Sequence, residues 1–114
     1  MELTRFKVKS GKSGLVDEWM KMLQDNLPAA IETLEGEKMY VEAIFRENKD
    51  GQDYLYWFIV QGEDGINVND SEHEIDKKHN QYFRECVDPS DPDFMKDMDL
   101  QLFLKAKKLD FEAL

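Results

Sequence analysis

The chain is poor in the residues that build covalent and metal centres. Its 114 residues include one cysteine, Cys86, and two histidines, His73 and His79. A single cysteine excludes an internal disulfide, and the two histidines do not have the i, i+4 spacing of a helical zinc pair. Glycine-rich phosphate loops, nucleophile elbows and Cys-x-x-Cys pairs are absent from the sequence. The sequence therefore indicates no metal and no cofactor.

Positive charge is also scarce. Fifteen lysines and arginines stand against 25 aspartates and glutamates, which gives a formal net charge of −10. Such a surface repels nucleic-acid phosphates and anionic lipid headgroups. No apolar run approaches the roughly 20 residues that cross a bilayer, and the first residues do not resemble a signal peptide. We therefore expect a cytoplasmic protein that binds neither nucleic acid nor membranes.

The sequence does contain segments in which apolar residues recur with the spacing of a strand, alternating with segments that have the spacing of a helix. Alternating apolar and polar residues predict four strands, at residues 4–8, 39–45, 54–60 and 100–104. The pair Asp50-Gly51, between the second and third of these runs, is typical of a tight hairpin turn. The middle two strands are therefore expected to pair with each other.

Two helices are predicted between these strands. The first starts after Ser13, its expected N-cap, breaks near Asn26 because Pro28 suits only the first turn of a helix, and stops at Gly36. The second starts at the capping-box spacing of Ser71 and Glu74 and stops before the prolines at 89 and 92.

The order strand, helix, strand, strand, helix, strand predicts an α+β fold of the ferredoxin-like βαββαβ type. In that fold both helices cover one face of an antiparallel sheet. We expect a single domain over residues 1–114, with residues 105–114 as a C-terminal tail. Alternation places Val41, Ala43 and Phe45 on the face toward the helices. The opposite face then contains Tyr40, Glu42, Ile44, Arg46, Tyr54, Tyr56, Phe58, Val60 and Phe103.

That second face has too many aromatic side chains to remain exposed to solvent. A large apolar patch on a small domain typically marks an interaction surface. Stacking of RNA bases on these aromatics would require a positive field, which a chain of charge −10 does not supply. The sequence therefore predicts a homodimer in which two such faces pack across a two-fold axis.

Three segments resemble a small family of unknown function within the dimeric α+β barrel superfamily. They are Tyr40-Val41-Glu42-Ala43-Ile44-Phe45-Arg46-Glu47, Tyr54-Leu55-Tyr56-Trp57 and His73-Glu74-Ile75-Asp76-Lys77-Lys78-His79. The resemblance implies dimerisation and a pocket between sheet and helices. It implies no activity, because a fold by itself does not define a function.

The candidate catalytic residues are His79 and Asp76. His79 lies on the apolar stripe of the second helix, one turn after Asp76, so that a carboxylate is placed to orient the imidazole as in a general base. The alternative is a histidine at the edge of the core with a purely structural hydrogen bond. Cys86 lies on the same stripe, away from any helix N-terminus, and is interpreted as a buried, unreactive thiol.

The candidate ligand-binding residues are aromatic or charged. They are Trp19, Glu42, Arg46, Tyr56, Trp57 and Tyr82. Glu42 and Arg46 fit either a ligand cavity or an ion-pair network at the dimer interface. The aromatic residues fit either a cavity wall or the core.

Three functional hypotheses remain open. The first is a cofactor-independent enzyme that binds or converts a small, largely apolar molecule with His79 as acid or base. The second is a binding protein without turnover, for an apolar metabolite or for haem held by His79. The third is a homodimeric interaction protein without a ligand site.

Overall fold

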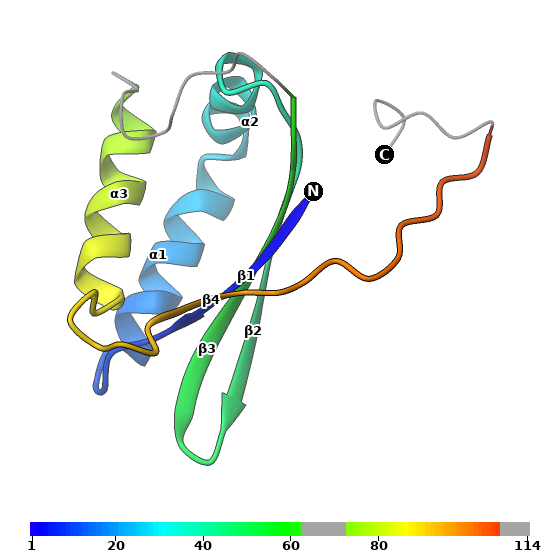
Figure 1. Ribbon diagram of the computed structural model, residues 1–114. Helices are drawn as coiled ribbons and strands as arrows, with labels where there is room; N and C mark the ends of the chain where they lie inside the picture. Colours follow the sequence, from blue (N-terminus) through cyan, green and yellow to red (C-terminus); the bar gives the residue numbers. More distant parts are fainter. Residues whose placement is uncertain (63–72, 108–114) are drawn as a thin grey trace.

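The computed structural model describes residues 1–62 and 73–107. Their elements are β1 (Glu2–Lys7), α1 (Ser13–Asp25), α2 (Leu27–Gly36), β2 (Met39–Lys49), β3 (Gln52–Gln61), α3 (Glu74–Cys86) and β4 (Met95–Asp97). All three helices lie on one side of the sheet (Figure 1). Within the described residues, no helix has the length and apolarity that a membrane span requires.

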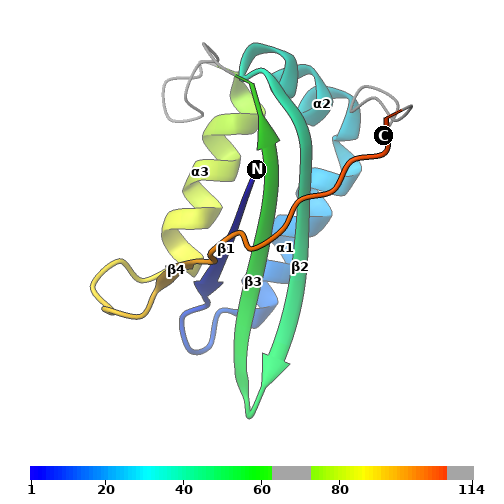
Figure 2. The ribbon, with the colours of Figure 1, turned by 45° about the vertical axis from the view of Figure 1, so that its right-hand side comes forward.

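The four strands form one antiparallel sheet in the order β2-β3-β1-β4. Figure 2 shows the sheet in front of the helices, with the long hairpin of β2 and β3 extending beyond them. This is an α+β architecture compatible with the predicted ferredoxin-like fold.

The predicted break in the first helix is confirmed. α1 ends at Asp25, and α2 begins at Leu27 with Pro28 in its first turn, where a missing N–H costs no hydrogen bond. The predicted N-cap is wrong, because Lys12 occupies that position without a side-chain bond. The hydroxyl of Ser13 instead donates to the Asp53 carboxylate at 2.5 Å and ties the helix start to β3.

The hairpin turn is also confirmed. Asp50 and Gly51 have φ angles of 53° and 83°, the left-handed pair that matches the twist of a two-residue hairpin. Both strands are longer than predicted, because the polar segments that flank the turn also pair, down to Lys49 opposite Gln52.

Helix α3 begins at Glu74, with His73 as N-cap and its Nδ1 accepting from the backbone N–H of Ile75. The predicted start at Ser71 lies outside the described residues. The helix ends at Cys86, before the predicted proline-rich stop.

The predicted fourth strand at residues 100–104 is wrong. The strand that pairs with β1 is Met95–Asp97, and the Thr4 hydroxyl donates to the Asp97 carboxylate at 2.8 Å across this pair. After β4 the chain leaves the sheet on the side away from the helices (Figure 1). Leu102 and Leu104 are 73% and 81% exposed, so the alternating run is extended but does not join the sheet.

The predicted faces of β2 are reversed. Glu42, Ile44 and Arg46 lie opposite Ile59, Trp57 and Leu55 of β3. Because side chains directly opposite each other share a face, these β2 residues point toward the helices. The more apolar alternate set, Val41, Ala43 and Phe45, lies on the outer face, where Phe45 is 61% exposed.

The packed core fills one end of the layer between helices and sheet. Val8, Val16, Trp19, Leu55 and Cys86 form its buried cluster. These residues come from the position just after β1, from α1, from the first half of β3 and from the end of α3. The other end of the layer, beneath α2, contains a cavity.

Candidate functional site

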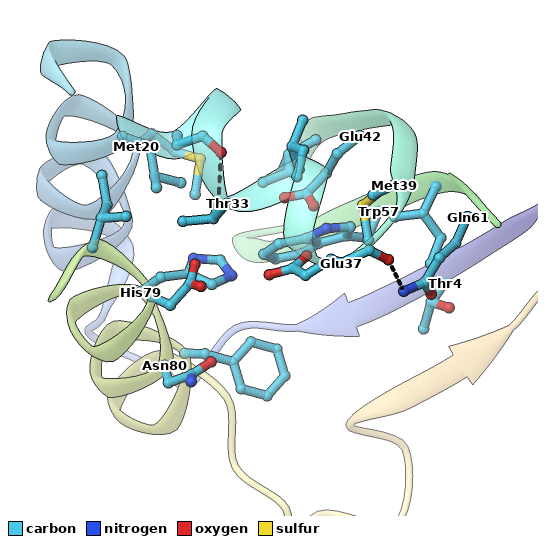
Figure 3. A pocket seen from close by; sticks show the side chains of 18 of the residues that line it. Thr4, Met20, Thr33, Glu37, Met39, Glu42, Trp57, Gln61, His79 and Asn80 are labelled. Atoms are coloured by element: carbon cyan, nitrogen blue, oxygen red, sulfur yellow. Dashed lines mark hydrogen bonds between the residues drawn. The ribbon is translucent and has the colours of Figure 1, made fainter. Parts of the chain in front are cut away.

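A cavity of about 790 Å³ lies between the helices and the sheet. Its walls come from the second half of α1, from α2, from α3 and from the inner face of the sheet, and Figure 3 shows their side chains converging. This volume falls within the range of small-molecule sites.

Aromatic rings form the inner wall of the cavity. Trp57 of β3 lies 5.4 Å from the imidazole of His79 and 5.9 Å from Phe6, measured between ring centroids. Phe83 packs edge-on against Phe6 at 5.0 Å. Trp19 is fully buried behind His79 and Trp57 and does not itself line the space. The aromatic wall is therefore supported from behind by the core.

His79 is held by Trp19. The indole Nε1–H donates to Nδ1 of the imidazole at 3.0 Å, which leaves Nε2 as the protonated nitrogen of the neutral ring. Burial lowers the pKa of His79, and the nearby Asp76 offsets part of this effect. The sequence predicted that Asp76 orients the ring, but among the described residues the hydrogen bond to His79 comes from Trp19.

Three carboxyl groups from three elements meet in the cavity. Glu37 follows α2, Glu42 lies on β2, and Asp76 lies in the first turn of α3. Burial, followed by the charges of Asp76 and Glu42, raises the pKa of Glu37 from 4.5 to about 7. Burial also raises the pKa of Glu42; a hydrogen bond from Trp57 lowers it, and the charge of Asp76 raises it further. The three groups therefore act on one another.

Asp76 has an unmet hydrogen-bonding requirement. The residue is 5% exposed, and its Oδ2 has no hydrogen-bond partner among the described residues. A buried carboxylate oxygen without a donor is costly, because its desolvation is not compensated. The α3 N-terminus offsets part of that cost through the helix dipole.

Three of the residues singled out from the sequence lie away from the cavity. Arg46 pairs with Asp53 at 2.7 Å and with Asp17, and also donates to the backbone carbonyl of Ser13. In this network, hydrogen bonds from the hydroxyl of Ser13, from Arg46 and from Asn48 lower the pKa of Asp53 to about 2. The network fixes α1 on the hairpin.

Tyr82 and Tyr56 are the other two. The Tyr82 hydroxyl donates to Glu18 of α1 at 3.0 Å, on the far side of the α1–α3 contact. Tyr56 lies on the outer face, and its hydroxyl donates to Glu47 at 3.0 Å. The structure thus brings His79, Asp76, Trp57 and Glu42 together at one cavity and places these two tyrosines elsewhere.

Sequence reasoning missed Glu37 and the contribution of α2. Glu37 follows Gly36 in a polar stretch, and no periodic pattern distinguishes it from its exposed neighbours. Only its position at the C-cap of α2, turned into the space beneath that helix, makes it a cavity residue.

The electrostatic character of the cavity is acidic. Among the described residues, its ionisable lining consists of five carboxyl side chains and one imidazole, namely Glu2, Glu37, Glu42, Asp76, Asp97 and His79. No group of three or more His, Cys, Asp or Glu within residues 1–62 and 73–107 is arranged to hold a metal ion.

The fold and the site together define a small α+β domain with an acidic, aromatic-walled cavity between helices and sheet. The chain belongs to a family of unknown function (DUF6176), whose model matches residues 1–110. No significant match was found among curated proteins or among solved structures.

Proposed function

We propose that this protein binds a small molecule with a largely apolar body in the cavity beneath α2. The observation that carries the proposal is the buried, unpartnered Oδ2 of Asp76 at the wall of an aromatic-lined space of about 790 Å³. A folded protein retains a buried polar group without a hydrogen-bond partner, despite its cost in stability, where that group binds a ligand.

The lining supports an apolar ligand body. Trp57, Phe6 and Phe83 present rings, and α2 contributes aliphatic side chains such as Ile31 and Leu34. Apolar walls with few convergent polar groups are typical of small-molecule sites. His79 adds an Nε2–H donor whose orientation Trp19 fixes.

A cavity-filling substitution tests this proposal. Ala30 lines the cavity, whereas its neighbour Ala29 on the same helix does not. We expect a fragment screen to find compounds that shift the Trp57 indole N–H resonance and raise the melting temperature of the wild type. Ala30→Phe should abolish both effects, and Ala29→Phe should retain them. A screen without any such compound would overturn the proposal.

Acid–base conversion of the bound molecule is a second candidate. The observation that favours it is that Glu37, with a pKa of about 7, shares the cavity with a neutral, oriented imidazole. Two titratable groups with different pKa values are what proton transfer requires. Turnover of a ligand by wild type that is lost in both Glu37→Gln and His79→Gln would support conversion, and unchanged ligand after long incubation would exclude it.

We further propose that the outer face of the sheet packs against a second copy of the chain. The face presents apolar side chains at Leu3, Phe45 and Phe58, and the Nε of Arg5 has no hydrogen-bond partner among the described residues. The exposed leucines at 100, 102 and 104 leave on the same side. The resemblance to the dimeric α+β barrel superfamily supports the same arrangement.

Light scattering tests the dimer. The wild type should have twice the mass of one chain at micromolar concentration, because an obligate apolar interface is large. Phe45→Glu, on the outer face, should give the mass of one chain. Leu27→Glu, which places the same charge on an exposed apolar position of α2, should leave the dimer intact. A wild type with the mass of one chain would contradict the proposal.

A further inference from the structure

We infer that the ligand of this cavity is an organic cation, an amine or amidine joined to an apolar, preferably aromatic, body. The inference rests on the proposed binding function and specifies its ligand class. Two independent observations carry it: the sign of the charges around the space, and a buried acceptor atom that has no donor.

The first observation is the charge of the lining. Every acidic or basic side chain that lines the cavity within the described residues is a carboxyl group, apart from the neutral imidazole of His79. An anionic ligand would meet uncompensated repulsion at every charged contact. A cation forms charge-assisted hydrogen bonds with the same groups, which are stronger than neutral ones.

The positions of three of these carboxyl groups locate the cationic end. Glu37, Glu42 and Asp76 line the same space from the end of α2, from β2 and from α3. The charges of Asp76 and Glu42 add to the effect of burial in raising the pKa of Glu37. Like charges gathered in a buried space disfavour one another's ionised forms. A bound ammonium or amidinium group attracts all three carboxylates and so offsets their mutual repulsion. The binding of a cation at that position is therefore favourable.

The second observation is the Asp76 acceptor. Its Oδ2 is buried without a hydrogen-bond partner within the described residues, although Asp76 itself lines the cavity. An acceptor-only group is satisfied by a donor, and a protonated amine or amidine brings two or more N–H donors to one carboxylate. The unmet requirement of Asp76 therefore matches what a cationic ligand supplies.

The aromatic wall of the cavity indicates the apolar part of the ligand. Figure 3 shows Trp57 between Glu42 and the imidazole of His79, and the two rings are 5.4 Å apart between centroids. A cation near an indole face is attracted by the ring quadrupole, and an aryl group stacks on the same surface. The carboxyl groups and the ring are adjacent, so a short link between amine and aryl group fits the cavity.

Matched probes test the inference. We would titrate the protein at pH 8 with 2-phenylethylamine, with 2-phenylethanol as its neutral counterpart and with phenylacetate as an anion, following the Trp57 indole N–H resonance. The amine should bind at least about tenfold more tightly than the alcohol, since one charge-assisted contact is worth about that factor. The anion should bind most weakly.

Charge-neutral variants separate a specific site from general acidity. Asp76→Asn and Glu42→Gln should each weaken amine binding by about tenfold and change alcohol binding by less than about twofold. Glu85→Gln removes one charge from the exposed end of the same helix α3, outside this cavity, and should leave the amine affinity unchanged. Circular dichroism would establish that each variant is folded; two variants are used so that one misfolded protein does not decide the result.

The outcomes distinguish the inference from the binding function on which it rests. Equal binding of amine and alcohol would overturn the cation and retain the cavity as a binding site. No binding by any probe, including larger arylalkyl amines, would overturn both. Displacement of the amine by millimolar Mg²⁺ or Ca²⁺ would identify an inorganic cation site and overturn the organic ligand. An amine preference that survives in both Asp76→Asn and Glu42→Gln would also overturn the inference.

Discussion

The carboxyl group of Glu37 titrates near neutral pH because it is only 5% exposed and has two acidic neighbours. Its folded pKa of about 7 exceeds its ordinary value of 4.5. Between these two values the folded state holds a proton that the unfolded state has released. Stability is therefore lost as the pH rises through this window and is constant above it.

Replacing Glu37 with glutamine should remove this pH dependence. Below about pH 4.5 the variant and the wild type should be equally stable, and by pH 8 the variant should be more stable by on the order of 1–3 kcal/mol. Chemical denaturation at several pH values measures this. Glu35→Gln, at an exposed position of α2 two residues earlier, is the control and should follow the wild-type curve. Parallel curves for wild type and Glu37→Gln would contradict the prediction.

The charge of Asp76 favours the protonated form of His79. In Asp76→Asn the pKa of His79 should therefore fall further, because burial then acts without its partial compensation. NMR titration of the imidazole measures the shift. Glu74→Gln, in the same first turn but exposed, should leave the titration unchanged. An identical curve in Asp76→Asn would show that the two groups are not coupled.

Sequence reasoning found the residues of the cavity that interrupt a pattern. His79 is recognisable because a polar residue on an apolar helical stripe is unusual, and Asp76 because it lies one turn before His79. Glu37 interrupts no hydrophobic pattern in the sequence, and its burial depends on where α2 lies over the sheet. The hydrogen bond from Trp19 to His79 likewise joins residues 60 positions apart, which no local pattern indicates.

At the scale of elements, the helix break and the hairpin were predictable, whereas the face of β2 was not. Pro28 and the Asp50-Gly51 pair fix a helix break and a hairpin through backbone geometry, and both predictions hold. The face of β2 depends on its register against β3, including the irregularity between Met39 and Val41. Apolarity favoured the wrong set, because the inward position of Arg46 is stabilised by carboxylates from α1 and β3.

The hairpin turn offers a matched pair of substitutions. A Cβ at Gly51 or at Gly14 would meet no atom within 4 Å, but only Gly51 has a positive φ, of 83°. Gly51→Ala should therefore destabilise the protein by about 1 kcal/mol through backbone strain alone. Gly14→Ala, in α1, should stabilise it by up to about 1 kcal/mol. Denaturant unfolding measures the free energy of unfolding of both variants. Equal changes in the two would exclude backbone strain at position 51.

At the scale of the whole molecule, the order of elements was sufficient to predict an antiparallel α+β fold. Short connections and antiparallel pairing leave few ways to arrange these elements. The short β4 was not predicted, because its sequence is polar and its pairing is set by β1. Residues 100–104, whose alternating pattern predicts the fourth strand, do not pair in the sheet of their own chain.

A dimer held through the outer face makes the thermal stability depend on concentration. Association favours the folded state by mass action, so the melting temperature should rise by a few degrees between about 1 and 100 µM chain. Calorimetry or fluorescence melting at several concentrations measures this. The Phe45→Glu variant should melt at one temperature throughout. A wild type that does the same would argue for a monomer.

Helix α2 has a position in the molecule that its neighbours do not share. It contains no fully buried residue, and its Leu27 is 53% exposed, yet five of its side chains line the cavity. Pro28 and the break at Asn26 separate it mechanically from α1. We expect a helix with so little of its own surface buried to open at a free energy below that of global unfolding. If so, local opening of this ten-residue helix gives the contents of the cavity a route to solvent that leaves the sheet and the aromatic core folded.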